Sequence, residues 1–414
     1  MNDIKEISPT VDGARLVGSA SQSLSGYINS YLKRMRSGDL GSLPIILGVI
    51  VIALIFQILN QNYLTPRNFV NLIVQMAGIT TIAIGVVYVL LLGEIDLSIG
   101  YVSAVAAVFM TLRMRPPDGW PWFAAIAVAL MFAALIGIVQ GMIITRFQLP
   151  SFVVTLAGFL VWNGMVLILI GSGGTVVIQD PIVIGLANSF LPSVWGWAVA
   201  VAIVALFAIG RVNRWRDRQR RGVSTTPLSI MLTQIIALAV LIGLAVYFAN
   251  RDRGVPFVGI VLLILLAAFT FLAERTQFGR YVYAIGGNME AARRAGISVN
   301  RIRVMVFMIS SLMAGVGGIV LASRLRSVDT AAGGGNLLLN SIAAAVIGGT
   351  SLFGGSGKVS SAFLGALVIA SIENGMGLLG LSAGVKFVIT GLVLLVAVLV
   401  DSLSRRSRSR SGLA

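Results

Sequence analysis

The sequence contains neither cysteine nor histidine, and only 11% of its 414 residues are charged. Without cysteine, the chain forms no disulfide framework and offers no thiolate to a metal or a substrate. Without histidine, it lacks the commonest general base and the commonest metal ligand of proteins. Both absences argue against enzymatic chemistry, and we expect no catalytic, metal-binding or cofactor-binding residues in this chain.

The shortage of charge is matched by a surplus of apolar residues, which form 57% of the chain and raise its mean hydropathy to +0.94. A soluble globular domain normally carries about 25% charged residues. Because the apolar residues are gathered in long runs without charges, we predict an integral membrane protein. A net charge of +16 would suggest nucleic-acid binding in a soluble protein. Basic cytoplasmic loops of a membrane protein explain it better, so we expect no nucleic-acid partner.

Long apolar runs recur along the chain, and a membrane-spanning helix needs about 20 such residues. Ten runs approach this length: 44–60, 70–92, 122–144, 152–171, 195–210, 228–249, 255–273, 303–322, 360–378 and 384–401. Two shorter runs, 97–112 and 338–352, are flanked by glycine. We therefore predict an all-α integral membrane protein whose domain spans residues 44–401. It is a bundle of about 12 transmembrane helices (roughly 10–12), some short or broken.

Polar ends flank this domain, namely a tail over 1–43 without the apolar core of a signal peptide and a basic tail over 402–414. With both termini in the cytoplasm, 23 of the 31 Lys and Arg residues lie in cytoplasmic segments and 7 in external ones. The positive-inside rule favours this orientation. The most basic segment, the loop 211–222, then serves as a topology anchor near anionic lipid headgroups, and a partner contact there stays open.

The polar segment 274–303 lies between two apolar runs and contains one short predicted helix. An asparagine is placed to cap the helix, a glutamate lies in its first turn and two arginines lie near its end, as the helix dipole favours. Two alanines favour helix, and a glycine is suited to end it in the left-handed conformation. These residues are Asn288, Glu290, Ala291, Ala292, Arg293, Arg294 and Gly296. A surface helix in a solvated loop is the simpler interpretation, but its place between two spans on the basic side favours contact with a soluble partner.

The first of two glycine-rich breaks lies at 93–100 and carries the polar residues Glu94, Asp96 and Ser98. A carboxylate costs about 2.5–3.5 kcal/mol at mid-span, so these groups need an interface, a partner or a wet cavity. We expect the break to form the cytoplasmic end of a tight helical hairpin, with Asp96 or Ser98 capping the next helix. Acid–base catalysis by the carboxylates is disfavoured, since no histidine or electrophile accompanies them.

The second break, 347–358, lies on the same predicted side and includes Gly348, Gly349, Thr350, Gly354 and Gly355. It superficially resembles a phosphate-binding loop. The register of that motif is missing, because Val359 follows Lys358 where Ser or Thr is required. We therefore expect no nucleotide on this chain. The matching placement of the two breaks hints at an internal repeat.

Two charges fall inside predicted spans, Glu373 and Lys386. Both lie towards the outer ends of neighbouring antiparallel spans, so we predict that they neutralise each other, with direct substrate contact as the alternative. Small residues are abundant along 310–318 and 360–370 and predict close helix packing.

Residues 290–292, followed by Gly296, resemble the EAA-and-glycine loop of ABC-transporter permease subunits. The Ile, Leu and Pro that continue that pattern are replaced by Val306, Met308 and Ile309. This departure is similar to the sugar-permease branch of the ribose, galactose and xylose type, the binding-protein-dependent inner-membrane components. The segments GEIDLSIG, FGRYVYAIGGN and AAAVIGGTSLFGG, at 93–100, 278–288 and 343–355, share the likeness. The GEIDLS form and the additional spans around the basic loop look most like the xylose permeases.

The resemblance implies a permease subunit in a bacterial cytoplasmic (inner) membrane. Two such chains, as a homodimer, would form the pathway for a monosaccharide, a pentose such as xylose. A cytoplasmic ATPase subunit or tandem ATPase would bind ATP and Mg, and a periplasmic or extracellular sugar-binding protein would deliver the solute. The helix near 289–295 would be the coupling helix that contacts the ATPase.

Other solutes stay open, namely another sugar, a nucleoside or a branched-chain amino acid. A stand-alone secondary transporter is a further alternative. Such carriers are expected to keep ionisable residues near mid-membrane. Here the charges cluster at span ends and histidine is absent, which disfavours that alternative.

Overall fold

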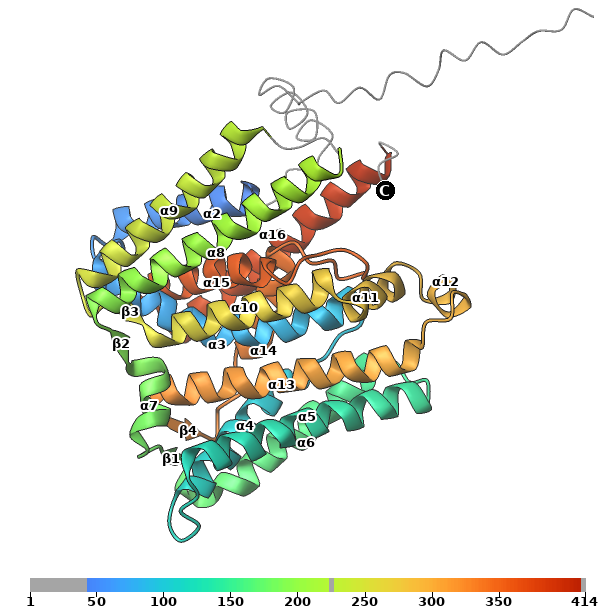
Figure 1. Cartoon of the computed structure of the whole chain (residues 1–414). Helices are drawn as coiled ribbons and strands as arrows, with labels where there is room; N and C mark the ends of the chain where they lie inside the picture. Colours follow the sequence, from blue (N-terminus) through green and yellow to red (C-terminus); the bar gives the residue numbers. More distant parts are fainter. Residues whose placement is uncertain (1–42, 223–226, 411–414) are drawn as a thin grey trace, which may run out of the picture. The chain divides into compact units, whose positions relative to one another are not determined.

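The computed structural model describes residues 43–222 and 227–410, and most of them are helical (Figure 1). The α-helices are α2 (Leu43–Leu59), α3 (Pro66–Leu91), α4 (Ile99–Met114), α5 (Trp122–Arg146), α6 (Ser151–Ile170), α7 (Pro181–Asn188), α8 (Ser193–Arg220), α9 (Leu228–Asn250), α10 (Phe257–Arg275), α11 (Gln277–Gly287), α12 (Met289–Arg294), α13 (Val299–Leu325), α14 (Leu337–Ile347), α15 (Ser361–Leu378) and α16 (Ala383–Arg410). A 3₁₀ turn at Gly171–Gly173 follows α6. The strands are β1 (Thr175–Val177), β2 (Phe190–Leu191), β3 (Val255–Pro256) and β4 (Ser327–Asp329).

The chain forms two compact units. Of the described residues, 194–247 form the smaller unit, which holds nearly all of α8 and most of α9. The larger unit contains the other helices and all four strands. Within the larger unit, α11 and α12 lie at one end and the strands at the opposite end (Figure 1). We call these the α12 end and the strand end.

In the part of the chain that the structure describes, eight helices are long and apolar enough to cross a membrane, namely α3, α5, α6 (with the following turn), α8, α9, α10, α13 and α15. Four apolar stretches there are shorter: α2, α4, α14 and residues 383–393 of α16. Each lies where the sequence predicts a span. Large apolar side chains are exposed along many of these helices, as a lipid solvent requires. The total of about 12 spans and the cytoplasmic placement of both termini remain predictions.

The core of the larger unit is built around α13, which packs along α3, α4 and α5. Small residues make this approach possible, as the sequence predicts. A Cβ added at Gly318 would lie 2.0 Å from the carbonyl oxygen of Ser103 on α4, and one at Gly137 would lie 2.3 Å from that of Phe307. Between α14 and α15, a Cβ added at Gly365 would lie 1.7 Å from the carbonyl oxygen of Ala344. The helix backbones therefore touch where glycine replaces a side chain.

Two small antiparallel sheets close the strand end. In the first, β1 pairs with β4, with Val176 opposite Val328; in the second, β2 pairs with β3. The short helix α7 lies between β1 and β2, and the Asp180 side chain caps it by accepting from Ile182 N at 2.9 Å. Neither the strands nor α7 were predicted. The aspartate followed by proline at 180–181 is a helix-start signal that the sequence does contain.

At the basic ends of α8 and α16, the structure differs from the predicted loop 211–222 and the predicted tail 402–414. Residues 211–220 are not a loop but the last turns of α8. Likewise α16 continues through Arg410, so most of the predicted tail 402–414 is helical. The boundary 402–414 overlaps residues 411–414, which lie outside the described residues, as does nearly all of the predicted tail 1–43. In α8, Arg214, Arg216, Arg218 and Arg220 are exposed. Continuing the helix there costs little, because arginine has a high helix propensity.

Candidate functional site

The predicted short helix is present as α12, and its two ends are fixed by its own residues. The side-chain oxygen of Asn288 accepts from the backbone N–H of Ala291 at 2.9 Å. At the other end, Gly296 N donates to Arg293 O and Ile297 N donates to Ala292 O, the bond pair of a Schellman motif. Gly296 has a φ of +83°, the left-handed conformation that glycine adopts without strain. The helix is therefore a rigid unit set by local sequence.

The two alanines of α12 lie on different faces of the helix. Ala291 is exposed, but Ala292 is only 5% exposed and packs into the core of the larger unit. Ala292 therefore does not leave room for a docking partner; it anchors the helix. Glu290 pairs with Arg293 at 3.1 Å and with Arg294 at 3.2 Å on its own helix. These exposed pairs contribute a few tenths of a kcal/mol.

The two glycine-rich breaks meet at the α12 end, beside α11. The backbone N–H of Gly355 donates to the carbonyl oxygen of Leu91 at 2.9 Å, which joins the second break to the end of α3. The Tyr283 hydroxyl of α11 donates to Gly357 O at 2.9 Å. Burial raises the pKa of the Tyr283 phenol, so the hydroxyl remains a donor. The two breaks, which were predicted to lie on the same side of the membrane, thus form one junction. We call it the break junction (Leu91, Gly93, Gly286, Gly354 and Gly355).

The other residues of the second break shape the loop after α14. Gly348 faces the Ser361 carbonyl, and a Cβ there would lie 2.1 Å from that oxygen. Gly349 has a φ of +98°, which reverses the chain. The Thr350 hydroxyl lies 3.3 Å from that of Ser361, at the start of α15. The loop thus packs against the helix that follows it, a structural role consistent with the absence of a phosphate-loop register.

The carboxylates of the first break are both partnered across the fold. Glu94 is buried and accepts from the Arg303 guanidinium in the first turns of α13. Asp96 accepts from the Ser98 hydroxyl at 2.7 Å and from the Ser310 hydroxyl of α13 at 2.9 Å. The segment between α3 and α4 is therefore bound to α13 at two positions. Arg303 and Ser310 were not singled out by sequence reasoning, since each lies more than 200 residues from its partner.

Two expectations for this break are wrong. The Ser98 side chain makes no cap hydrogen bond to α4, because it is bonded to Asp96 and to Gln140 at 3.1 Å. Asp96 accepts from the Ser98 N–H, ahead of the helix, and not from the first turn of α4. In addition, α3 and α4 are not a tight hairpin; both pack chiefly on α13. The carboxylates bind the segment to α13 instead of starting a helix.

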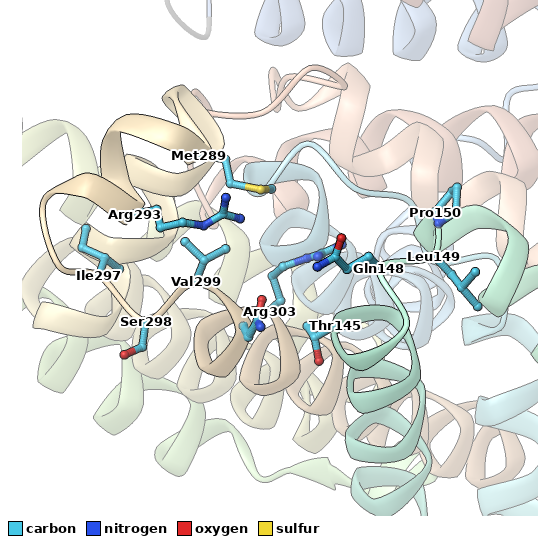
Figure 2. A pocket seen from close by; sticks show the side chains of 11 residues that line it. Thr145, Gln148, Leu149, Pro150, Met289, Arg293, Ile297, Ser298, Val299 and Arg303 are labelled. Carbon is cyan, nitrogen blue, oxygen red and sulfur yellow. The ribbon is translucent and has the colours of Figure 1, made fainter.

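A pocket of about 730 Å³ lies at the α12 end, between α12, the start of α13 and the turn after α5. Figure 2 shows side chains from all three segments around it, among them Arg293, Arg303 and Gln148. Arg303 thus lines this pocket and also holds Glu94. The buried ion pair between Glu94 and Arg303 therefore lies close to the exposed Arg293 of α12, across this pocket.

The in-span charges Glu373 and Lys386 line one pocket at the strand end, but among the described residues no ion pair joins them. Glu373 instead accepts from the Asn340 side chain of α14. Arg324 and Lys386 both lie near enough to attract the Glu373 carboxylate. The predicted direct pairing is therefore replaced by an amide contact with two cations nearby. Within the described residues, no cluster of His, Cys, Asp and Glu is suited to hold a metal ion.

Comparison with known proteins identifies a family. The model described as "Branched-chain amino acid transport system / permease component" matches residues 68–398. The chain is 37% identical to the xylose transport system permease protein of Escherichia coli (strain K12) over 385 residues, 90% of this chain and 94% of that protein. It is 34% identical to the xylose transport system permease protein of Haemophilus influenzae over 382 residues, 90% and 99% of the two chains. It is 31% identical to the ribose import permease protein of Bacillus subtilis (strain 168) over 355 residues, 86% and 91%.

No solved structure matches the chain at a significant level. The family model nevertheless covers most of the sequence, and the relatives match along nearly their whole length. The apolar helices are those of a multi-pass membrane protein. The chain therefore belongs to the family of permease components that this model describes.

Proposed function

We propose that the chain is the membrane permease subunit of an ATP-driven ABC importer for a monosaccharide, a pentose such as xylose, in a bacterial cytoplasmic membrane. The observation that carries the proposal is the 37% identity along 94% of a xylose transport permease. The ribose import permease supports the sugar class. A branched-chain amino acid is the second candidate solute, because the family description names it.

The proposed importer includes several partners that this chain needs in order to transport its solute. A second permease chain, as a homodimer, completes the pathway. A separate cytoplasmic ATPase, single or tandem, binds ATP and Mg, while this chain carries no cofactor. A periplasmic or extracellular sugar-binding protein delivers the solute, and the lipid bilayer surrounds the apolar helices.

The α12 end supports a route for mechanical coupling. A short capped helix resists bending, and Ala292 anchors it to the core. Six residues after α12, the chain has already entered α13, which contacts α3, α4 and α5. Arg303 and Ser310 of α13 hold the first break through Glu94 and Asp96. Displacement of α12 by an ATPase would therefore be passed to α13 and to the break together.

Solute uptake tests the proposal directly. Cells that lack their own xylose transporter would express the chain with the ATPase and binding protein of the same source. We expect accumulation of labelled D-xylose, but not of L-leucine. Depletion of ATP should stop uptake, while collapse of the ion gradients at constant ATP should not. Uptake of leucine alone, or uptake that follows the ion gradient, would contradict the proposal.

The exposed face of α12 offers a second test. Ala291→Trp adds a large side chain to the solvent side and should weaken ATPase association roughly tenfold, or about 1.4 kcal/mol, by steric exclusion. The yield of folded permease should not change, since Ala291 is exposed. Ala331→Trp, exposed at the strand end, is the matched control and should leave ATPase association unchanged. Co-purification of the ATPase measures both; equal effects of the two variants would remove α12 as the contact.

A further inference from the structure

A second pocket lies at the strand end of the larger unit, at the opposite end from α12. It has a volume of about 570 Å³ and is bounded by α3, α13, α14, α15 and α16. Small-molecule sites in proteins usually measure roughly 300–1,000 Å³. We call it the strand-end pocket. It contains Glu373 and Lys386, two charged residues that take no part in the break junction or in the proposed coupling route from α12 to α13.

Side-chain amides dominate the polar lining of this pocket. Six of them line it: Asn68, Asn71, Gln75, Asn336, Asn340 and Asn374. Each amide presents both a donor and an acceptor. The three charged groups, Arg324, Glu373 and Lys386, add two donors and one acceptor. Such a lining suits a ligand whose polar groups both donate and accept, as hydroxyl groups do.

Several of these amides are held in place by other residues. Asn68 and Asn374 exchange hydrogen bonds at 2.7 and 2.9 Å, and Asn374 also donates to Gln75 at 3.1 Å. Asn71 accepts from Arg253 at 2.6 Å, and that guanidinium lies over the Phe190 ring. The amide array is therefore pre-organised, which lowers the entropic cost of binding.

Asn340 gives the second, independent observation. Its side chain is only 2% exposed and donates to Glu373, but its oxygen finds no hydrogen-bond partner among the described residues. Leaving a buried acceptor without a donor is unfavourable, and most such groups in native proteins are satisfied. Asn340 also lines the strand-end pocket, so a ligand bound there with donor groups would supply the missing partner.

We infer that the strand-end pocket binds a neutral monosaccharide on its way into the permease; the inference rests on the proposed sugar-transport function. Sugar hydroxyls donate to the Asn340 oxygen and the Glu373 carboxylate, and accept from Lys386 and Arg324. The exposed ring of Phe387 offers an apolar surface to the C–H face of the sugar. A branched-chain amino acid has only its ammonium and carboxylate groups to bind this lining, whereas a monosaccharide offers several hydroxyl groups that both donate and accept.

The absence of cysteine allows a direct binding test in the full chain. Gly377→Cys places a reporter on the pocket wall, where an added Cβ meets no atom within 4 Å. Gly384→Cys is the matched control, exposed and equally open but outside the lining. Each variant, in lipid nanodiscs, is treated with a water-soluble thiol reagent, with D-xylose or L-leucine added. With D-xylose at about twice its Kd, modification at 377 should slow roughly threefold, since only the empty pocket reacts.

Two lining variants test the residues themselves. Asn340→Leu removes the open acceptor, and protection of Gly377→Cys by D-xylose should disappear. Glu373→Gln keeps an acceptor for Asn340 and should reduce protection without altering the fold. The rate without sugar should stay the same in both backgrounds, which reports an intact pocket. Unchanged protection in both variants would overturn the assignment of these residues.

The outcomes separate the pocket from the proposed function. D-xylose protection at 377 but not at 384, with no effect of L-leucine, supports the site. Equal effects at both positions, protection at neither, or protection by L-leucine alone overturns it. If the intact transporter imports xylose while Gly377→Cys is not protected, only the pocket assignment fails. If no sugar is imported at all, the proposed function itself fails.

Discussion

Replacing Gly286 with alanine should abolish uptake and lower the yield of folded permease, whereas Gly287→Ala should leave both unchanged. A Cβ at Gly286 would lie 1.7 Å from the Leu91 carbonyl oxygen and 2.6 Å from the Gly355 nitrogen. These two atoms hydrogen-bond each other, so neither can move without opening the break junction. Overpacking costs about 1–3 kcal/mol where side chains can shift, and backbone atoms yield less readily.

Gly287 is the adjacent control, because an added Cβ there meets no atom within 4 Å. It is also the last residue of α11, so alanine would stabilise the helix slightly. The fraction of protein that remains monodisperse in detergent during heating measures the effect on folding, and labelled sugar uptake measures the effect on transport. Equal behaviour of the two variants would show that the break junction is not closely packed in the working protein.

The second large loss of stability and uptake is expected when the buried ion pair between Glu94 and Arg303 is broken. Glu94→Gln or Arg303→Met leaves one charge buried without its partner, and each should destabilise the permease by about 3–5 kcal/mol. The double variant leaves no unpaired charge. Its loss should therefore be smaller than the sum of the single losses. Uptake should fall with each single variant, because the first break would separate from α13.

The exposed pair of Glu290 with Arg293 is the control for this cycle. Glu290→Gln should cost no more than about 0.5 kcal/mol, because exposed helix pairs contribute little. The thermal midpoint of each purified variant measures stability, and uptake is recorded in parallel. Strictly additive losses for Glu94→Gln and Arg303→Met would mean that the pair is not coupled, and the route from α12 to the first break would lose its link.

Local features were predicted well from sequence because they depend on nearby residues. The caps of α12 are Asn288, which bonds the N–H three residues later, and Gly296, whose left-handed backbone ends the helix. Both signals act within one turn. Which face of α12 is buried could not be predicted from the sequence. Two adjacent alanines are identical in composition, and only the packing against the larger unit distinguishes buried Ala292 from exposed Ala291.

The partners of in-span polar groups were predicted less well. The sequence suggested that Glu373 pairs with Lys386, thirteen residues away on the next span. In the structure, Glu373 instead accepts a hydrogen bond from Asn340 on α14. Nothing in the sequence distinguishes Asn340 from the many other amide residues of the chain. The Asn68–Asn374 pair joins residues 306 positions apart. No local pattern specifies such contacts, because the choice of partner depends on which helices become neighbours.

The sequence by itself determined the class of this protein, its apolar helices and the ends of α12. Lipid offers the backbone no hydrogen bonds, so each long apolar run must close its own bonds as a helix, wherever it is placed. Only the tertiary structure decided that the two glycine-rich breaks meet beside Gly286, that Glu94 and Asp96 bind α13, and that six amides line one pocket with Glu373. These arrangements depend on side-chain and backbone complementarity between helices distant in sequence, which composition and periodicity do not encode.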